Sequence, residues 1–580
     1  MTLRRKKLNI RALDVSFAVC FLLALCFMLW KAPYGFGGSD EAFYLTVPHR
    51  LALGDRLFAD EWHLSQLSAF FTLPYVRLFR LIVGSNDGIM LTARYTYVVI
   101  HSLAAIYLFI RLRRYGASAV FAAIIFMLYT PFDMMCYSYN TIALDMLSLA
   151  GVTAGTADAG ARASMPLAGF MFACAVICCP YLAAVYALYA LIVLLAAIWR
   201  RRNAALPAQG LFTGAVFARI TLGILLAVVL FAVFFFRHTS VKELFASFPG
   251  IFSDPEHPSY SVIFMLKHYI YCLVTAHKLM LLPLALYAVH LAALALDKNR
   301  RAHAWLHVVL SSAVALICWA LFIGGLTEQY YNSIMLPLAF VGFTSYVLLD
   351  EKPRALFAAL FVPGVLYSMC VSATSNMGFN VMGMAFSTAN IASAVFIGLL
   401  LRQCMHGGGA HRAISMCALA APLVCLAALV VIVKGTHCFW EASPAQLDSV
   451  IQDGPARGII TAERLCEDYT RIYDELSEYK SMPGENILVY AQETWCYLIL
   501  DDHPYAGFSA WLSGLDDTTV ERLRLYYSLR PEKTPKYIYI LKSTAFTPVN
   551  LDSDEIYSAA NKNGYAVEES ALSWRLEKLA

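Results

Sequence analysis

Apolar runs about twenty residues long recur through most of the first 434 residues, and no other feature constrains the fold as strongly. A run of this length crosses the hydrocarbon core of a bilayer as an α-helix. Backbone polar groups in lipid must be paired internally, so recurrent runs predict a bundle of membrane-spanning helices. Charged residues make up 14% of the chain, against about 25% in soluble domains. The sequence therefore predicts a polytopic α-helical membrane protein.

Basic clusters indicate how these runs cross the membrane, because Lys and Arg gather in short loops on the cytoplasmic side. The clusters RRKK, RLRR, WRRR and KNRR all fall inside when the N-terminus is cytoplasmic. This orientation predicts about 13 spans, with the first uncleaved and the C-terminal part outside the cytoplasm. Predicted spans with assigned limits lie near 15–31, 89–110, 118–132, 141–156, 212–236, 279–296, 304–324 and 413–434.

Charge separates the chain into a membrane region, 1–434, and a predicted soluble domain, 435–580. The second part holds 13 Lys and Arg against 23 Asp and Glu, whereas the first holds 31 against 17. An acidic soluble part repels phosphate, which disfavours nucleic-acid binding. Strands are predicted at 485–491, 535–542 and 565–579, and helices at 462–480 and 518–530. Helices between strands predict a small α/β domain with a mostly parallel sheet.

Cofactor motifs are absent from the sequence. The 15 cysteines form no CxxC pair and no Cys/His ligand spacing, and most lie inside apolar runs. Such cysteines behave as small buried hydrophobic residues. The chain also has no GxGxxG or GxxxxGK loop, so no nucleotide site is predicted.

The loop after the first span, about 32–88, is unusually rich in ionisable groups. Asp40 and Glu41 stand at its beginning, at the predicted outer mouth of that span. A carboxylate is costly in lipid, so acids at this depth usually face a cavity or groove. Such a carboxylate can accept a proton or bind a cation. The alternative is that Asp40 caps a short interfacial helix through its side-chain oxygen.

The residues of this loop resemble those of a known enzyme family. Asp40-Glu41-Ala42-Phe43-Tyr44, followed by Leu53-Gly54-Asp55, resembles the first outer loop of the GT-C membrane glycosyltransferases. The stretch is most similar to the branch that holds the protein O-mannosyltransferases and the lipid A aminoarabinose transferases. These begin with one span, an Asp-Glu-x-x-Tyr motif, an amphipathic helix ending near Gly-Asp, and a second amphipathic helix, here 64–83. The resemblance covers the layout of the whole chain.

The resemblance implies transfer of a sugar from a polyprenyl-phosphate donor to a glycan, lipid or protein acceptor at the outer face of the plasma membrane. Asp40 would then be the catalytic base, and Glu41 would bind the acceptor or tune Asp40. The aminoarabinose transferases carry Glu-Lys-Pro-Pro where this chain has the stretch 61–66, EWHLSQ, without a lysine. His63 and Gln66 are therefore candidates for contacts to sugar or phosphate. A divalent metal at His63 is one interpretation, and a hydrogen-bonding histidine is the other.

Other polar residues fall on the same side of the membrane if the predicted topology holds. Aromatic rings and amides suit a sugar site, although tyrosines also form belts at membrane interfaces. The candidates for substrate contact are Tyr44, Tyr139, Asn140, Glu328 and Asn376. Basic candidates for the lipid phosphate are Arg94, Lys267 and Lys278. Arg94 lies inside a predicted span, where a charge needs a partner.

Two other functions compete with transfer. A transporter or flippase for lipid-linked sugars should show inverted repeats and broken helices at matching positions, and no clear internal repeat is seen. A polymerase-type or assembly protein would also use outer loops, but would not need Asp-Glu directly after the first span. The sequence therefore favours a membrane glycosyltransferase.

Overall fold

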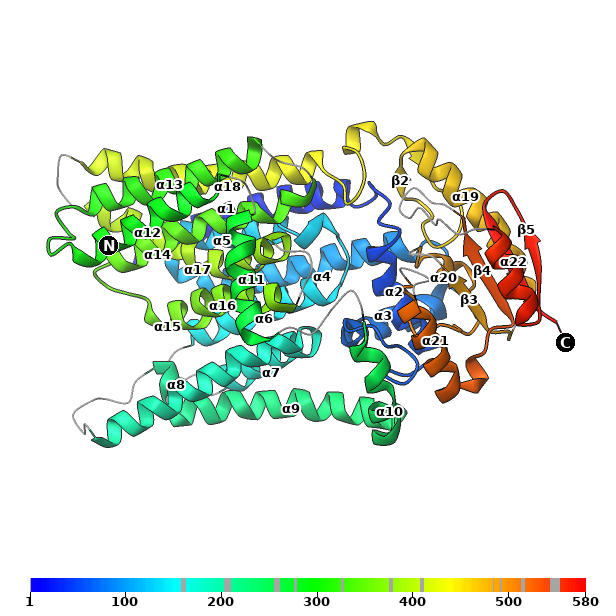
Figure 1. Ribbon diagram of the computed structural model, residues 1–580. Coiled ribbons are helices and arrows are strands. Elements are labelled where there is room, and N and C mark those ends of the chain that lie inside the picture. Colours follow the sequence, from blue (N-terminus) through cyan, green and yellow to red (C-terminus); the bar gives the residue numbers. More distant parts are fainter. Residues whose placement is uncertain are drawn as a thin grey trace.

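Long helices form most of the molecule. They lie side by side in a bundle at the left of Figure 1, and a smaller α/β unit covers one end of it (Figure 1). The computed structural model describes residues 2–157, 163–202, 210–254, 261–275, 279–324, 328–374, 379–406, 411–482, 484–490, 493–512, 517–542 and 553–579. Within these ranges, nine helices are long and apolar enough to cross a membrane, and three shorter helices are also apolar.

A helix lies at each of the predicted spans. The bundle comprises α1 (Thr2–Lys31), α4 (Ile89–Leu112), α5 (Ala117–Leu128), α6 (Tyr139–Gly155), α7 (Ser164–Cys178), α8 (Ala183–Arg202), α9 (Gly214–His238), α11 (Val262–Thr275), α12 (Leu281–Leu296), α13 (Ala304–Gly324), α14 (Leu336–Leu348), α15 (Arg354–Leu356), α16 (Val362–Thr374), α17 (Phe379–His406) and α18 (Arg412–Thr436). A π-helical turn, Phe357–Phe361, joins α15 to α16. The predicted polytopic helical architecture is confirmed.

Helix α6 crosses the interior of the bundle. Nearly all of its side chains are buried, including those of polar residues such as Asp145. The Asp145 carboxylate lies 3.0 Å from Nδ1 of His101 on α4. Protein surrounds this helix, so it tolerates polar side chains that lipid would exclude.

The predicted loop 32–88 folds into two helices, α2 (Asp40–Ala52) and α3 (Ala69–Val83). Val76 and Phe79 of α3 are buried, whereas Leu81 and Ile82 are exposed. The predicted second helix, 64–83, thus begins only at Ala69, after a short 3₁₀ turn. A further short helix, α10 (Val241–Phe252), begins with a capping box between Ser240 and Glu243.

The C-terminal unit contains a four-stranded sheet flanked by helices. Its elements are β1 (Ser449–Val450), β2 (Ile460–Thr461), α19 (Glu463–Ser477), β3 (Ile487–Tyr490), α20 (Cys496–Ile499), α21 (Asp517–Leu529), β4 (Tyr537–Leu541), α22 (Ser553–Lys562), β5 (Tyr565–Glu569) and β6 (Ser573–Lys578). The sheet order is β3-β4-β6-β5. Among the described strand pairs of this sheet, β3 and β4 are parallel, whereas β4 with β6 and β5 with β6 are antiparallel.

The prediction of a mostly parallel sheet is therefore wrong. The segment 565–579 is a hairpin of two strands rather than a single strand. The Ser570 hydroxyl accepts hydrogen bonds from the backbone N–H groups of Leu572 and Ser573, which stabilises the turn. A serine hydroxyl bonded to the backbone in this way favours a turn. The chain therefore reverses at Ser570, although apolar and polar residues alternate on both sides of it.

The C-terminal unit shares a hydrophobic core with the loop after the first span. Phe36 and Ala42 of the loop belong to the same buried cluster as Tyr469 and Trp495. The Phe36 ring lies 5.6 Å from the Trp495 ring, edge to face. The division at residue 434 stays a prediction.

Candidate active site

Asp40 is the first residue of α2, at the junction between the bundle and the C-terminal unit. The N-cap residue is Ser39, whose side chain makes no capping hydrogen bond. Asp40 therefore does not occupy the capping position that the alternative interpretation required. A negative charge in the first turn still suits the helix dipole. Asp40 is half-buried, whereas nearly all of the residues after it in this helix are buried.

Glu41 pairs with Arg94 of α4. Arg94 Nε lies 2.6 Å from Glu41 Oε1, and Nη2 lies 2.6 Å from Oε2. Both side chains are almost fully buried. Such a two-point pair holds a carboxylate in one orientation, so Glu41 acts as an anchor for the start of α2.

The remaining donors of Arg94 are also occupied. Nη1 donates to the carbonyl oxygens of Ala32 and Tyr34, at 2.8 and 3.2 Å, and Nη2 donates to that of Gly35, at 2.6 Å. All five N–H groups of the guanidinium thus have protein acceptors. This geometry does not leave Arg94 available for the lipid phosphate that the sequence suggested.

Two tyrosines stand beside Asp40. The rings of Tyr44 and Tyr139 lie 6.0 Å apart, and the Asp40 carboxylate acts electrostatically on both. Burial, followed by the nearby Tyr139 and Asp40, raises the pKa of the Tyr44 hydroxyl well above its usual value. Tyr44 therefore stays protonated at neutral pH and can donate a hydrogen bond.

Asn140 follows Tyr139 at the start of α6 and leaves an acceptor without a partner. Its side chain is buried, and its Oδ1 atom has no hydrogen bond among the described residues. Buried polar atoms are nearly always paired in folded proteins. An exception this close to Asp40 is suited to a substrate hydroxyl.

His63 and Gln66 have different surroundings. His63 Nδ1 accepts a hydrogen bond from the Ser65 backbone N–H, at 3.2 Å, so the proton of the neutral ring is on Nε2. The ring lies 4.6 Å from that of Phe43, next to the Asp40 helix turn. Gln66 instead accepts from the backbone N–H of Phe58, a residue with positive φ. Gln66 thus supports the loop conformation.

The remaining predicted residues are Lys267, Lys278, Glu328 and Asn376. Lys267 is exposed on α11. Glu328 begins a 3₁₀ stretch, although its side chain lies outside the described part of the chain. Lys278 and Asn376 also fall outside the described residues. Within the described ranges no group of three or more His, Cys, Asp and Glu side chains could hold a metal ion.

A buried cluster of charges beside Glu41 was not predicted. Asp133 lies between Lys434 Nζ, at 2.6 Å, and Lys31 Nζ, at 3.3 Å. Phe132 and Asp133 both have positive φ, a conformation that costs energy in residues other than glycine. The two lysines directly follow the apolar parts of the first and last spans, which is the signal that could have indicated them.

A small cavity separates this cluster from the Glu41–Arg94 pair. Its volume is about 20 Å³, and Lys31, Glu41, Arg94 and Asp133 line it. That volume is sufficient for one water molecule. The Oδ2 atom of Asp133 forms the ion pair with Lys31 and makes no further hydrogen bond among the described residues. The cluster joins the ends of α1 and α18 to the loop before α6, and so supports the candidate site from behind.

The other acids of the loop bind the C-terminal unit or the loop itself. Arg50 donates to Asp55, at 2.8 Å, and to Glu61, at 2.7 Å, and all three side chains are buried. Lys533 forms an ion pair with Asp55. The backbone N–H of Trp62 donates to the Phe508 carbonyl oxygen, at 2.8 Å. Asp55 of the Leu-Gly-Asp motif is therefore part of a domain contact.

Comparisons with known proteins give distant likenesses only. No protein-family model matches the chain, and no curated protein matches it. The crystal structure of ArnT from Cupriavidus metallidurans in the apo state is 12% identical, with a TM-score of 0.40 and 98% of each chain covered. The oligosaccharyltransferase of Archaeoglobus fulgidus, tethered to an acceptor peptide, is 11% identical, with a TM-score of 0.39, covering 97% of this chain and 74% of that one.

Proposed function

We propose that this protein is a membrane glycosyltransferase that moves a sugar from a polyprenyl-phosphate donor to an acceptor at the outer face of the membrane, with Asp40 as general base. One observation carries the proposal. Of two adjacent carboxylates, Glu41 is held on both oxygens by Arg94, whereas Asp40 is half-buried beside Tyr44 and Tyr139. The two acids have separate roles, and Asp40 has the one suited to chemistry.

The reaction needs a base and a good leaving group. Asp40 takes the proton of an acceptor hydroxyl, and the hydroxyl oxygen forms a bond to the anomeric carbon. The bond between that carbon and the phosphate oxygen breaks, and polyprenyl phosphate leaves with the electron pair. Attack from the face opposite the phosphate inverts the anomeric configuration. The proton stays on Asp40 until solvent removes it.

The surrounding groups suit a sugar. Tyr44 and Tyr139 offer aromatic faces next to the Asp40 carboxylate, and Asn140 offers an amide oxygen that no described residue pairs with. Flat apolar surfaces and a few directed polar groups are typical of such sites. His63, whose ring lies 4.6 Å from that of Phe43, extends the polar surface on that side. We assign these four residues to substrate contact.

Lys267 remains the proposed contact for the donor phosphate. Lys267 lies on helix α11, which packs on α16. The hydroxyl of Tyr269 on α11 lies 3.1 Å from the hydroxyl of Ser368 on α16. On α16 the Tyr367 hydroxyl lies 3.9 Å from Cys179 Sγ, which in turn lies 3.7 Å from the Tyr139 carbonyl oxygen. This chain of contacts connects α11 to the neighbourhood of Asp40. Lys278, Glu328 and Asn376 stay predictions from the sequence.

The test is transfer by the purified full chain in nanodiscs. A panel of polyprenyl-phosphate sugars is supplied with candidate acceptors, and loss of each donor is followed by mass spectrometry. Asp40→Asn is compared with wild type and with Asp448→Asn, an exposed acid of the C-terminal unit. We expect one donor to be consumed by wild type and by Asp448→Asn, and spared by Asp40→Asn.

Two outcomes contradict the proposal. Equal consumption by Asp40→Asn and wild type would remove Asp40 from the chemistry. Binding of a donor without consumption by any variant, together with movement of that donor across vesicle membranes, would establish a transporter instead.

A further inference from the structure

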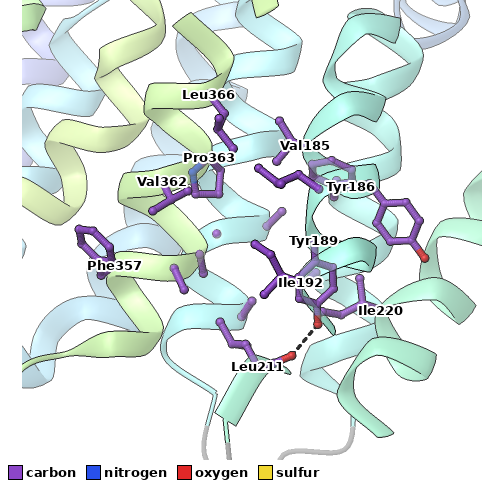
Figure 2. A pocket seen from close by; sticks show the side chains of 18 of the residues that line it. Val185, Tyr186, Tyr189, Ile192, Leu211, Ile220, Phe357, Val362, Pro363 and Leu366 are labelled. Carbon is purple, nitrogen blue, oxygen red and sulfur yellow. Dashed lines mark hydrogen bonds between the residues drawn. The ribbon is translucent and has the colours of Figure 1, made fainter. Parts of the chain in front are cut away.

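A large apolar groove lies at the end of α6 remote from Asp40. Its volume is about 430 Å³, and its walls come from α6, α7, α8, α9 and the segment α15–α16. Figure 2 shows Val185, Tyr186, Tyr189 and Ile192 of α8 facing Val362, Pro363 and Leu366 of α16 across it. Gly151 of α6 lines the groove and is twelve residues from Tyr139, or roughly 18 Å along a helix.

The tyrosines of the groove present rings rather than hydroxyls to its interior. The Tyr186 hydroxyl lies 2.6 Å from Thr221 Oγ1, and the Tyr189 hydroxyl donates to the Leu211 carbonyl oxygen at 2.6 Å (Figure 2). Leu188 and Ile192 of the lining are both 38% exposed, so the groove opens at the surface of the bundle. In a bilayer this opening faces lipid chains, and an empty space of this size would forfeit dispersion contacts.

Close helix contacts hold the groove open. A methyl group added to Gly151 would overlap the Ala359 carbonyl oxygen, and one added to Gly223 of α9 would overlap that of Pro166. These glycines bring α6 against the π-helical turn, and α9 against α7, as closely as backbones allow. Because α6 and α9 are already in backbone contact with these neighbours, the helices that form the walls cannot move closer together to fill the groove.

A cation stands at the mouth of the groove. Arg354 is the charged residue of the lining and is exposed, and its guanidinium group makes no hydrogen bond or ion pair with the described residues. Burial, followed by repulsion from Arg300 and Arg354, lowers the pKa of Lys352. These three cations are therefore close enough to act on one another. The acids nearby are Asp350, which pairs with Arg301 at 2.7 Å, and the exposed Glu351. The positive charge is in excess.

We propose that the groove binds one acyl chain of an anionic glycerophospholipid, with the phosphate of that lipid on Arg354. Basic pockets between membrane helices on the cytoplasmic side bind anionic headgroups, and the positive-inside prediction places Arg354 on that side. The polyprenyl donor is a less suitable occupant, because its phosphate must reach Asp40 at the other end of α6. The site is therefore separate from the proposed active site.

The test measures which lipid the full chain retains. Purified protein is equilibrated in mixed micelles with equal amounts of phosphatidylglycerol and phosphatidylcholine, repurified, and analysed by native mass spectrometry. We expect phosphatidylglycerol to be retained about fivefold over phosphatidylcholine, which is the effect of about one basic side chain on an anionic lipid. Arg354→Gln should abolish this preference while a chain remains bound. Ala154→Phe, which fills the groove, should reduce retention of both lipids.

Two controls separate the groove from other parts of the protein. Arg412→Gln removes an exposed arginine at the start of α18 that does not line the groove, and should retain phosphatidylglycerol as wild type does. Asp40→Asn should do the same, so failure of the proposed chemistry would leave this result intact. The proposal would be overturned if wild type retained phosphatidylglycerol and phosphatidylcholine equally, as Arg354→Gln is expected to do. Recovery of polyprenyl phosphate as the bound lipid, or unchanged retention by Ala154→Phe, would also overturn it.

Discussion

The two ends of α6 are stabilised in opposite ways. At the Tyr139 end, buried charges lie next to one another, as in the Glu41–Arg94 pair and the Asp133–Lys434 pair. At the Gly151 end, backbones touch through glycines and surround an apolar groove. Buried charge pairs fix orientation but depend on both partners, whereas close packing depends on volume. Substitutions should therefore fail by different mechanisms at the two ends.

The largest effect expected is on catalysis, at Asp40. Asp40→Asn keeps the size of the side chain and removes its basicity, so the rate of transfer should fall by about 10²- to 10⁴-fold. The thermal unfolding temperature should change little, because the pair between Glu41 and Arg94 is intact. The measurement is kcat for donor consumption beside a thermal unfolding curve. A loss of stability equal to the loss of activity would make Asp40 a structural residue.

Glu41→Gln, at the adjacent position, should mainly lower the stability of the protein, in contrast to Asp40→Asn. It leaves the Arg94 charge buried without a carboxylate, and removing one partner of such a pair costs about 3–5 kcal/mol of unfolding free energy. The double variant Glu41→Met with Arg94→Met should be more stable than Glu41→Gln, because neither charge remains. Denaturant unfolding measures this. Equal stability of Glu41→Gln and wild type would show that the pair does not anchor α2.

The apolar end should respond to volume alone. Gly223→Ala places a methyl group against the Pro166 carbonyl and should destabilise the bundle by about 1–3 kcal/mol, the usual cost of overpacking. Gly214→Ala is the matched control, since it lies on the same helix with no atom within 4 Å of the added methyl. Thermal unfolding compares the two. Similar curves for both variants would mean that the contact between α7 and α9 yields readily.

Acid should weaken the polar end at His49. Burial, followed by repulsion from Arg80, lowers the pKa of His49 from 6.5 to about 3. His49 contacts the Tyr505 hydroxyl at 2.8 Å, between α2 and the C-terminal unit. Below pH 6.5 the unfolded chain binds a proton that the folded protein excludes, so stability falls as pH falls towards 3. The loss amounts to about 2 kcal/mol at pH 5.

His49→Gln tests this assignment. Its unfolding free energy should depend less on pH between 7.5 and 5 than that of wild type, measured by chemical denaturation at several pH values. Identical pH profiles would assign the acid sensitivity to other groups. Gly223→Ala, as a change at the apolar end, should shift the whole profile without changing its slope.

Several parts of the fold could be predicted because they depend on local patterns. Each predicted span coincides with a helix, and the helix that begins at Asp40 lies where the Asp-Glu-x-x-Tyr motif suggested. The prediction of a mostly parallel sheet was wrong because a turn at Ser570 divides the segment 565–579 into two antiparallel strands. Apolar and polar residues alternate on both sides of that turn, so the two strands were predicted as one. Helix α6 was assigned as a span from its length, but its polar side chains are explained only by the helices that surround it.

The candidate site divides in the same way. Asp40 and Tyr44 were named from the resemblance of the Asp-Glu-x-x-Tyr motif, and Tyr139 and Asn140 from residue type and predicted sidedness. The structure brings the four residues to one place. Arg94 was named as a phosphate ligand, yet its five donors are used by Glu41 and three backbone carbonyls. Lys31, Asp133 and Lys434 were missed, since they lie about 100 to 400 residues apart in the chain.

The sequence by itself determined which segments are helices in a membrane and which loop concentrates the acids, because hydrophobic length and local charge act within one segment. Only the tertiary structure decided which of the two adjacent carboxylates is neutralised. That outcome depends on Arg94, which is 53 residues away, and on the backbone that it also binds. Charge pairing in a buried site depends on distance and desolvation, and neither is encoded in the order of neighbouring residues.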